Sequence, residues 1–253
     1  MRAVLTALAL LVAAPAVAQQ ARFCPNRPDL GSGACTTEPG RVLVELSVLD
    51  AERDPSGDTT LIGDVLVRTG LGNSTELQIG WTALGLARGG GDRATGIGDI
   101  RLGLRQNLID PTGEQFAVAV EPFVTLPVGR QPIGRDGASY GVAVPVGIPL
   151  NDSWDIGVTG QASAEPDADG RGRHLALLGI AGLGYTVTDQ VGVVGELSVE
   201  RDDDPGDATT ELLAAGSIAW RPRDLLQIDL LVAAGLNRVS PNVRVVLGGA
   251  ILF

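Results

Sequence analysis

The stretch VRVVLGGAILF, residues 243–253, alternates between two kinds of side chain. One parity is apolar as far as Phe253, and the other carries mostly smaller residues together with the charge of Arg244. Successive side chains of a β-strand point to opposite faces. The stretch therefore predicts a strand with one wholly apolar face and an aromatic ring at its end.

The same alternation recurs beyond residue 40, in segments that turn-forming residues separate. We expect twelve strands, at residues 41–50, 59–70, 74–86, 96–108, 115–126, 138–150, 153–164, 173–187, 190–200, 209–221, 224–236 and 242–253. An even number of antiparallel strands can close into a barrel that leaves no strand edge unpaired. The sequence therefore predicts an all-β protein, a 12-stranded antiparallel up-and-down transmembrane β-barrel.

The connections between the expected strands alternate in length. Short ones, such as GLGN at 70–73 and LNDS at 150–153, alternate with mostly longer polar ones, such as LPVGRQPIGRDG at 126–137 and ERDDDPGD at 200–207. Outer-membrane barrels have short periplasmic turns and longer extracellular loops. The rhythm favours that class of barrel and puts both chain ends on the periplasmic side.

Aromatic residues distinguish a membrane barrel from a soluble two-layer sandwich, in which strands alternate in the same way. Five of them share the apolar parity and lie at strand ends next to a short turn or the C-terminus: Phe116, Trp154, Tyr185, Trp220 and Phe253. Rings at one height, at the headgroup boundary, form an aromatic girdle. A sandwich core would place them mid-strand, so the pattern favours a membrane.

The N-terminus has the composition of a secretory signal peptide, with Arg2, an apolar stretch to Ala14 and small residues before Gln19. We expect a signal peptide at 1–18, an N-terminal periplasmic extension at 19–40 and the barrel at 41–253. Cys24 and Cys35 enclose a loop rich in Pro, Gly and Asp. In an exported chain such a pair is expected to form a disulfide.

Charge and composition exclude several classes of partner. The formal net charge of −11 argues against nucleic acid, whose phosphates need a basic surface. The chain has one histidine, His174, whereas a zinc site needs about four nitrogen or sulfur ligands, so we expect neither a metal site nor a cofactor.

Charged side chains of the second parity must line the interior, because an arginine facing lipid at the bilayer midplane costs ~2–4 kcal/mol. Either arginines and carboxylates bond into a plug of salt bridges, or they face each other across water and select solutes by their field. Arg105, central and inward, is the best candidate for a constriction residue. The candidates for the lumen and its constriction are Arg68, Asp99, Arg101, Arg105, Glu121, Glu196, Glu211, Asp229 and Arg244.

Residues 95–108, TGIGDIRLGLRQNL, resemble the Gly-x-Gly-Asp strand start of an outer-membrane family labelled "putative meta-pathway of phenol degradation". The matching positions are Gly96, Gly98, Asp99 and Gly103. The resemblance implies an outer-membrane channel loosely linked to the uptake of aromatic or other apolar compounds. The final strand also resembles the signature by which barrel proteins are recognised for outer-membrane insertion, which implies the barrel-assembly machinery as a partner.

We therefore expect a non-enzymatic channel of the bacterial outer membrane for passive passage of a small solute. Alternatives are a non-conducting structural or adhesive barrel, or a lipid-modifying enzyme with His174 as base and a nucleophile such as Ser163. The acidic loops lie where lipopolysaccharide is the neighbouring lipid, and they could share divalent cations with its phosphates.

Overall fold

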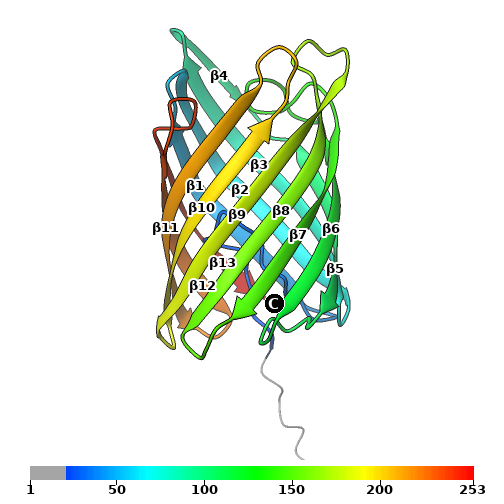
Figure 1. Cartoon of the computed structure of the whole chain (residues 1–253), viewed down its shortest axis with the longest axis vertical. Coiled ribbons are helices and arrows are strands. Elements are labelled where there is room, and N and C mark those ends of the chain that lie inside the picture. Colours follow the sequence, from blue (N-terminus) through cyan, green and yellow to red (C-terminus); the bar gives the residue numbers. More distant parts are fainter. Residues whose placement is uncertain (1–20) are drawn as a thin grey trace, which may run out of the picture.

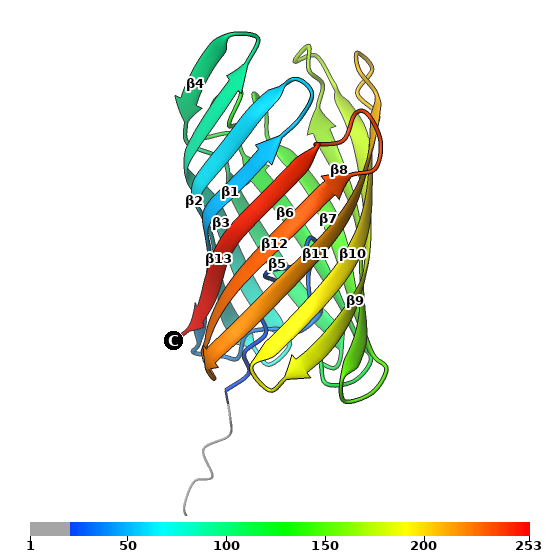
Figure 2. The same ribbon diagram turned by 90° about the vertical axis from the view of Figure 1, so that its left-hand side faces the viewer.

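The computed structural model describes residues 21–253, so the expected signal peptide at 1–18 lies outside the described residues. Thirteen strand segments form one sheet that closes on itself into a barrel, and every neighbouring pair of strands is antiparallel (Figures 1 and 2). The segments are β1 Val42–Arg53, β2 Gly57–Gly72, β3 Thr75–Gly89, β4 Asp92–Gly96, β5 Ile100–Ile109, β6 Ala117–Leu126, β7 Ser139–Pro149, β8 Trp154–Pro166, β9 Arg173–Thr188, β10 Val191–Asp202, β11 Thr209–Arg223, β12 Leu226–Gly235 and β13 Val243–Leu252.

Closure occurs between the first and last strands of the barrel, as the sequence predicts. β1 pairs with β13 along its whole length, and Val42 and Phe253 exchange backbone hydrogen bonds of 3.2 and 2.9 Å. No strand edge of the ring is left open, which satisfies the requirement for backbone inside a membrane. The closed 12-stranded antiparallel barrel is confirmed.

The strand expected at 96–108 is divided into β4 and β5, which both pair with β3. Residues 97–99 leave the sheet between them, and the Gly98 amide donates to the Thr82 carbonyl at 2.9 Å. A Cβ on Gly98 would lie 2.7 Å from the Thr82 Cβ, so a side chain does not fit there. β3 and β4 form a hairpin that extends beyond the closed ring, and the ring itself has twelve strands.

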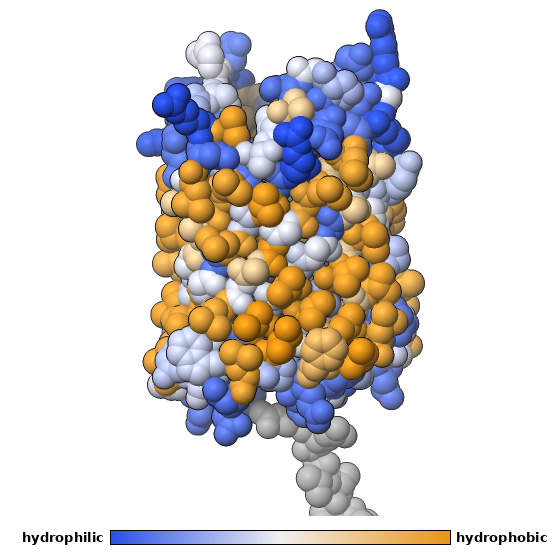
Figure 3. All heavy atoms as spheres, viewed as in Figure 1, coloured by the Kyte–Doolittle hydropathy of each residue, from blue (hydrophilic) through white to orange (hydrophobic). Residues whose placement is uncertain are grey.

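The two faces of the wall differ as the alternation predicts. On β12, Leu230 is exposed outward whereas Asp229 is buried inside. In Figure 3 apolar residues form a broad band around the barrel, with polar residues at both ends. No helix within residues 21–253 is long and apolar enough to cross a membrane.

The five aromatic residues of the expected girdle are all exposed: Phe116, Trp154, Tyr185, Trp220 and Phe253. They lie at the end of the barrel that carries the short turns, which we call the periplasmic end; the other we call the extracellular end. Trp154 and Tyr185 are register partners whose ring centroids are 4.5 Å apart. Their contact with the lipid headgroups stays a prediction.

The lipid-facing row yields a direct test. Leu230→Arg is expected to destabilise the folded barrel by ~2–4 kcal/mol, because the charge would face hydrocarbon near the midplane. Leu236→Arg, at the exposed extracellular end of the same row, serves as the control and should cost only ~0–1 kcal/mol. Urea titration of the folded band on unheated gels measures both. Equal losses at the two positions would contradict the membrane boundary.

Candidate functional site

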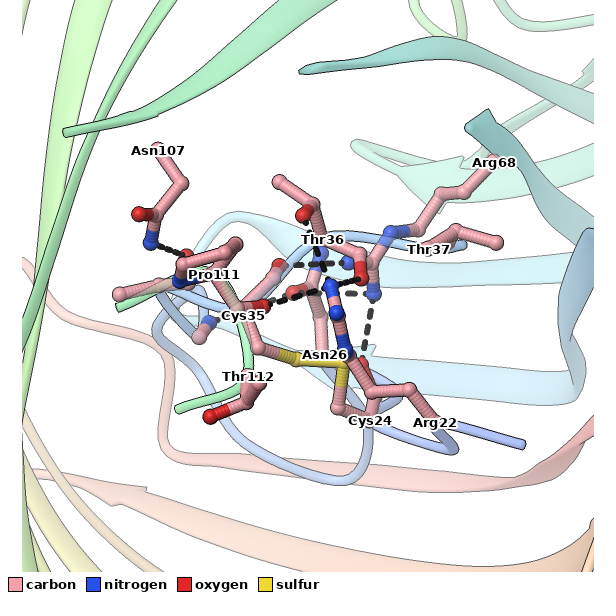
Figure 4. Close-up of a disulfide and its surroundings, with 12 residues drawn as sticks. Arg22, Cys24, Asn26, Cys35, Thr36, Thr37, Arg68, Asn107, Pro111 and Thr112 are labelled. Carbon is pink, nitrogen blue, oxygen red and sulfur yellow. Dashed lines mark hydrogen bonds between the residues drawn. A yellow bond between two sulfur atoms is a disulfide. The ribbon is translucent and has the colours of Figure 1, made fainter. Parts of the chain in front are cut away.

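Residues 22–37, which we call the plug, lie inside the periplasmic end of the barrel (Figure 4). This differs from the expected extension into the periplasm. Backbone amides of the plug donate to inward carboxylates: Leu30 to Glu196 at 2.7 Å, and Thr37 to Glu76 at 2.6 Å. The plug forms no strand, so the inward side chains of the barrel accept the hydrogen bonds of its backbone N–H groups.

The disulfide between Cys24 and Cys35 is confirmed, and it closes the plug into a loop. The carbonyl of Cys35 accepts hydrogen bonds from both Arg68 and Arg105, each at 3.1 Å, and that of Cys24 accepts one from Arg68 at 2.9 Å. The disulfide therefore places the backbone carbonyls of both cysteines next to the arginines of the lumen wall, as Figure 4 shows for Arg68.

Arg68 and Arg105 are fully buried between the plug and the wall. Arg68 forms ion pairs with Glu45 at 3.0 Å and Glu76 at 2.8 Å, and Arg105 with Glu76 at 3.3 Å and Glu121 at 2.8 Å. Two cations thus share three anions, and their remaining N–H groups go to the plug. Such charge-assisted bonds, fully satisfied, are strong and specific.

The opposite wall contacts the plug through other residues. Arg27 of the plug pairs with Asp229 at 2.7 Å, and Glu196 accepts from the amides of Leu30 and Gly31. Arg68 and Arg105 therefore do not meet Glu196 and Asp229 across the lumen. The plug lies between the two groups and satisfies each of them separately.

Arg105 cannot be the constriction residue of an open passage, because the plug covers it completely. Asp99 also differs from its predicted place. It lies between β4 and β5, and its two carboxylate oxygens accept from the amides of Gly129 and Arg135 at 2.9 and 2.8 Å. Asp99 thereby ties the loop at 127–138 to the extracellular mouth.

Arg101, Arg244 and Glu211 lie in the lumen nearer its extracellular end. The Arg101 guanidinium lies 3.4 Å from the centroid of the Phe123 ring and 3.5 Å from Glu121. Arg244 pairs with Asp50 at 2.7 Å near the extracellular end, where Glu211 is half-buried. All three line the interior. Arg101 approaches Glu121, which also binds Arg105, whereas Arg244 and Glu211 lie apart from Arg68 and Arg105.

Sequence reasoning placed Glu45, Glu76 and Gln227 on the inward parity but missed that they hold the plug. It also missed Thr159, which exchanges hydrogen bonds with the backbone of Ser32 at 3.0 and 3.2 Å. The parity of their strands predicts that they face inward, but no pattern indicates what they face. The many polar groups of residues 22–37 are the one feature of the sequence that indicates a segment able to bind these inward side chains.

Within residues 21–253, one cavity inside the lumen is lined by plug residues, and a second lies nearer the extracellular end. The periplasmic cavity, of about 370 Å³, is lined by Gly31, Thr159, Ile180 and Glu196 among others. The extracellular cavity, of about 230 Å³, is lined among others by residues of the same strands: Gln161, Ser163, Ala176 and Leu178. The boundary falls between residues only two positions apart on β8 and on β9. Residues 31 and 32 of the plug contact the wall at that boundary.

Asp29 of the plug lines the periplasmic cavity. The surrounding barrel wall and the carboxylates of Glu196, Asp155 and Asp229 raise the pKa of Asp29, although its side chain is exposed to the cavity.

The features proposed for a lipid-modifying enzyme do not converge. Ser163 is buried in the lumen and pairs in register with Ala176, on β9. His174 instead faces carboxylates, with Nδ1 3.0 Å from Asp167 Oδ1 and Nε2 2.9 Å from Asp202 Oδ1. Within residues 21–253, no serine hydroxyl is hydrogen-bonded to this imidazole. The pairing of nucleophile and base needed for that chemistry is therefore not present in this arrangement.

Comparison with known proteins places this architecture among outer-membrane barrels. The COG4313 outer membrane channel from Pseudomonas putida F1 is similar with a TM-score of 0.71 and 13% identity, over 89% of this chain and 99% of that one. The KdgM porin in complex with disordered oligogalacturonate is similar with a TM-score of 0.56 and 7% identity, over 84% of this chain and 99% of that one. No curated protein matches the sequence.

A sequence family provides the more specific match. The family model described as "Putative MetA-pathway of phenol degradation" covers residues 25–252, from the plug to the last strand. The Gly-x-Gly-Asp segment lies within that range, at the break between β4 and β5. The chain therefore belongs to this family.

Proposed function

We propose that the protein is an outer-membrane channel that passes small solutes by diffusion along the β7–β10 side of its lumen. The observation that carries this proposal is the pair of cavities whose linings lie only two residues apart on β8 and on β9. Residues 31 and 32 of the plug line the periplasmic cavity at this point and contact Thr159, Ile180 and Glu196. A displacement confined to one turn of the plug would join the two cavities into a continuous path.

The chemistry of the extracellular cavity indicates the class of solute. Arg101 stacks on Phe123, and its side chain remains one-third exposed. Leu178 and Ile133 supply apolar surface in the same cavity. A planar guanidinium binds carboxylates through paired hydrogen bonds and also stacks on rings. This combination suits a small solute with an aromatic or apolar body and one anionic group.

Planar-bilayer recording of the refolded full chain tests the proposal, with benzoate replacing chloride on one side. We expect small single-channel steps and a reversal potential showing that benzoate carries current. Arg101→Gln is expected to reduce the benzoate current more than the chloride current. A full chain that never conducts, whether or not its plug-deleted form does, would overturn the proposal in favour of a filled scaffold.

Two partners accompany this function as proposals. The exposed Phe253 side chain ends the lipid-facing row of β13, and we propose that this strand is the part recognised by the barrel-assembly machinery. The polar extracellular rim in Figure 3 lies where lipopolysaccharide is the outer lipid, and we propose contact between the two. Reconstitution with and without lipopolysaccharide, followed by a comparison of unfolding midpoints, measures the second contact.

A further inference from the structure

The single histidine lies in a cluster of carboxylates at the extracellular end. His174 stands at the start of β9, between the β8–β9 loop that carries Asp167 and the β10–β11 loop that carries Asp204. Its side chain is only 6% exposed. Nδ1 is 3.0 Å from Asp167 Oδ1 and 3.6 Å from Asp204 Oδ2. Two loops and the end of β10 thus bring carboxylates to the ring, which the sequence alone does not show.

The spacing of these three atoms matches a common set of metal ligands. Zinc binds nitrogen and oxygen at about 2.0–2.2 Å, which puts neighbouring ligands of a tetrahedral site about 3.3–3.6 Å apart. All three ligand atoms of Asp167, His174 and Asp204 lie within 4.8 Å of one another. A small rotation of the Asp167 carboxylate and of the His174 ring would place the three atoms around a common centre.

The surroundings orient the ligands before any ion binds. Asp204 Oδ2 accepts from the Ala168 amide and Oδ1 from the Gly206 amide, each at 2.7 Å, so this carboxylate is fixed across two loops. Asp202 Oδ1 lies 2.9 Å from His174 Nε2, on the far side of the ring from Asp167. A carboxylate at the second ring nitrogen is the usual support for a metal-bound histidine.

Three carboxylates face the His174 ring, those of Asp167, Asp202 and Asp204. The basic residues of the same cavity are engaged elsewhere, Arg135 with Glu165 and Arg173 with two backbone carbonyls.

We propose that Asp167, His174 and Asp204 form a binding site for a divalent transition-metal ion such as Zn²⁺, with Asp202 as the positioning residue for the imidazole. A nitrogen ligand beside two carboxylates selects such ions over Ca²⁺ and Mg²⁺, which prefer oxygen alone. A cavity of about 530 Å³ reaches the site from the extracellular loops and leaves room for water as the remaining ligands. The bound ion joins the β8–β9 and β10–β11 loops.

Isothermal titration of untagged, chelator-treated full chain with Zn²⁺ tests the site. We expect one ion per chain, affinity reduced at least tenfold by His174→Gln and by Asp204→Asn, and about tenfold by Asp202→Asn. The control is Asp203→Asn, because Asp203 is in the same loop but pairs with Arg201 at the surface; it should leave the affinity unchanged. Binding that survives His174→Gln, or that Ca²⁺ or Mg²⁺ displaces equally well, overturns the proposal.

Heat-modifiable migration on gels shows whether each variant folds. If the His174 variant fails to fold, X-ray absorption at the zinc edge of the unmodified protein decides the question. Scattering from one imidazole ring supports the site, whereas a shell of oxygen atoms alone, or no retained zinc, overturns it.

Discussion

A variant that lacks residues 22–37 is expected to form channels whose single-channel conductance is several-fold higher than that of the full chain. Plug residues line the periplasmic cavity, and we expect their loss to join it with the extracellular cavity into one wide lumen. The wall should survive, because Arg68 keeps Glu45 and Glu76, and Arg105 keeps Glu121, as partners from the barrel itself. Planar-bilayer recording measures the step size.

The disulfide supplies a graded control for this deletion. A Cys24→Ser, Cys35→Ser double variant keeps every plug residue but frees the loop that the disulfide closes. We expect its conductance to fluctuate between the level of the full chain and that of the deletion. Equal, steady conductance in the full chain, the double variant and the deletion would show that the plug does not limit passage.

Arg105→Met is expected to destabilise the folded protein by about 3–5 kcal/mol, the usual cost of removing one partner from a buried charge network. The change leaves Glu121 without its closest cation and the Cys35 carbonyl with one hydrogen bond fewer. Methionine keeps the unbranched shape of the arginine stem, so the loss reports charge and hydrogen bonding more than volume. The urea midpoint of the folded band on unheated gels measures it.

Arg101→Met is the matched control. Arg101 approaches the same carboxylate, Glu121, at 3.5 Å, but its side chain is one-third exposed to the lumen. We expect a loss of about 0–1 kcal/mol, as for exposed ion pairs. Adding Glu121→Gln to Arg105→Met should recover part of the stability by removing the unpaired charge. Equal losses for the two arginine variants would contradict the buried network.

The wall of the barrel could be predicted from the sequence, because strand alternation and turn length are local properties. The β1–β13 closure followed from the requirement that no edge face lipid, and the disulfide from two cysteines in an exported chain. Residues 22–37 have no such periodicity. Alternation shows that Glu76 and Arg105 face inward, but it does not show whether water or a chain segment fills the space in front of them.

The break between β4 and β5 shows a second limit. Asp99 has the parity of a lumen residue, yet its carboxylate binds backbone amides about thirty positions away, at Gly129 and Arg135. Such a contact depends on where a long loop returns in space. The proximity of Asp167, Asp202 and Asp204 to His174 was missed for the same reason, since they come from the β8–β9 loop, the end of β10 and the β10–β11 loop.

The plug is the first described part of the chain, but it binds some of the last strands. Arg27 pairs with Asp229 on β12, 202 positions later, and Leu30 binds Glu196 on β10. A chain truncated before these strands would keep Glu45 and Glu76 for the plug but would lack the partners of Arg27 and Leu30. Complete seating of the plug therefore requires the last strands, so the finished lumen reports that the whole barrel has been made.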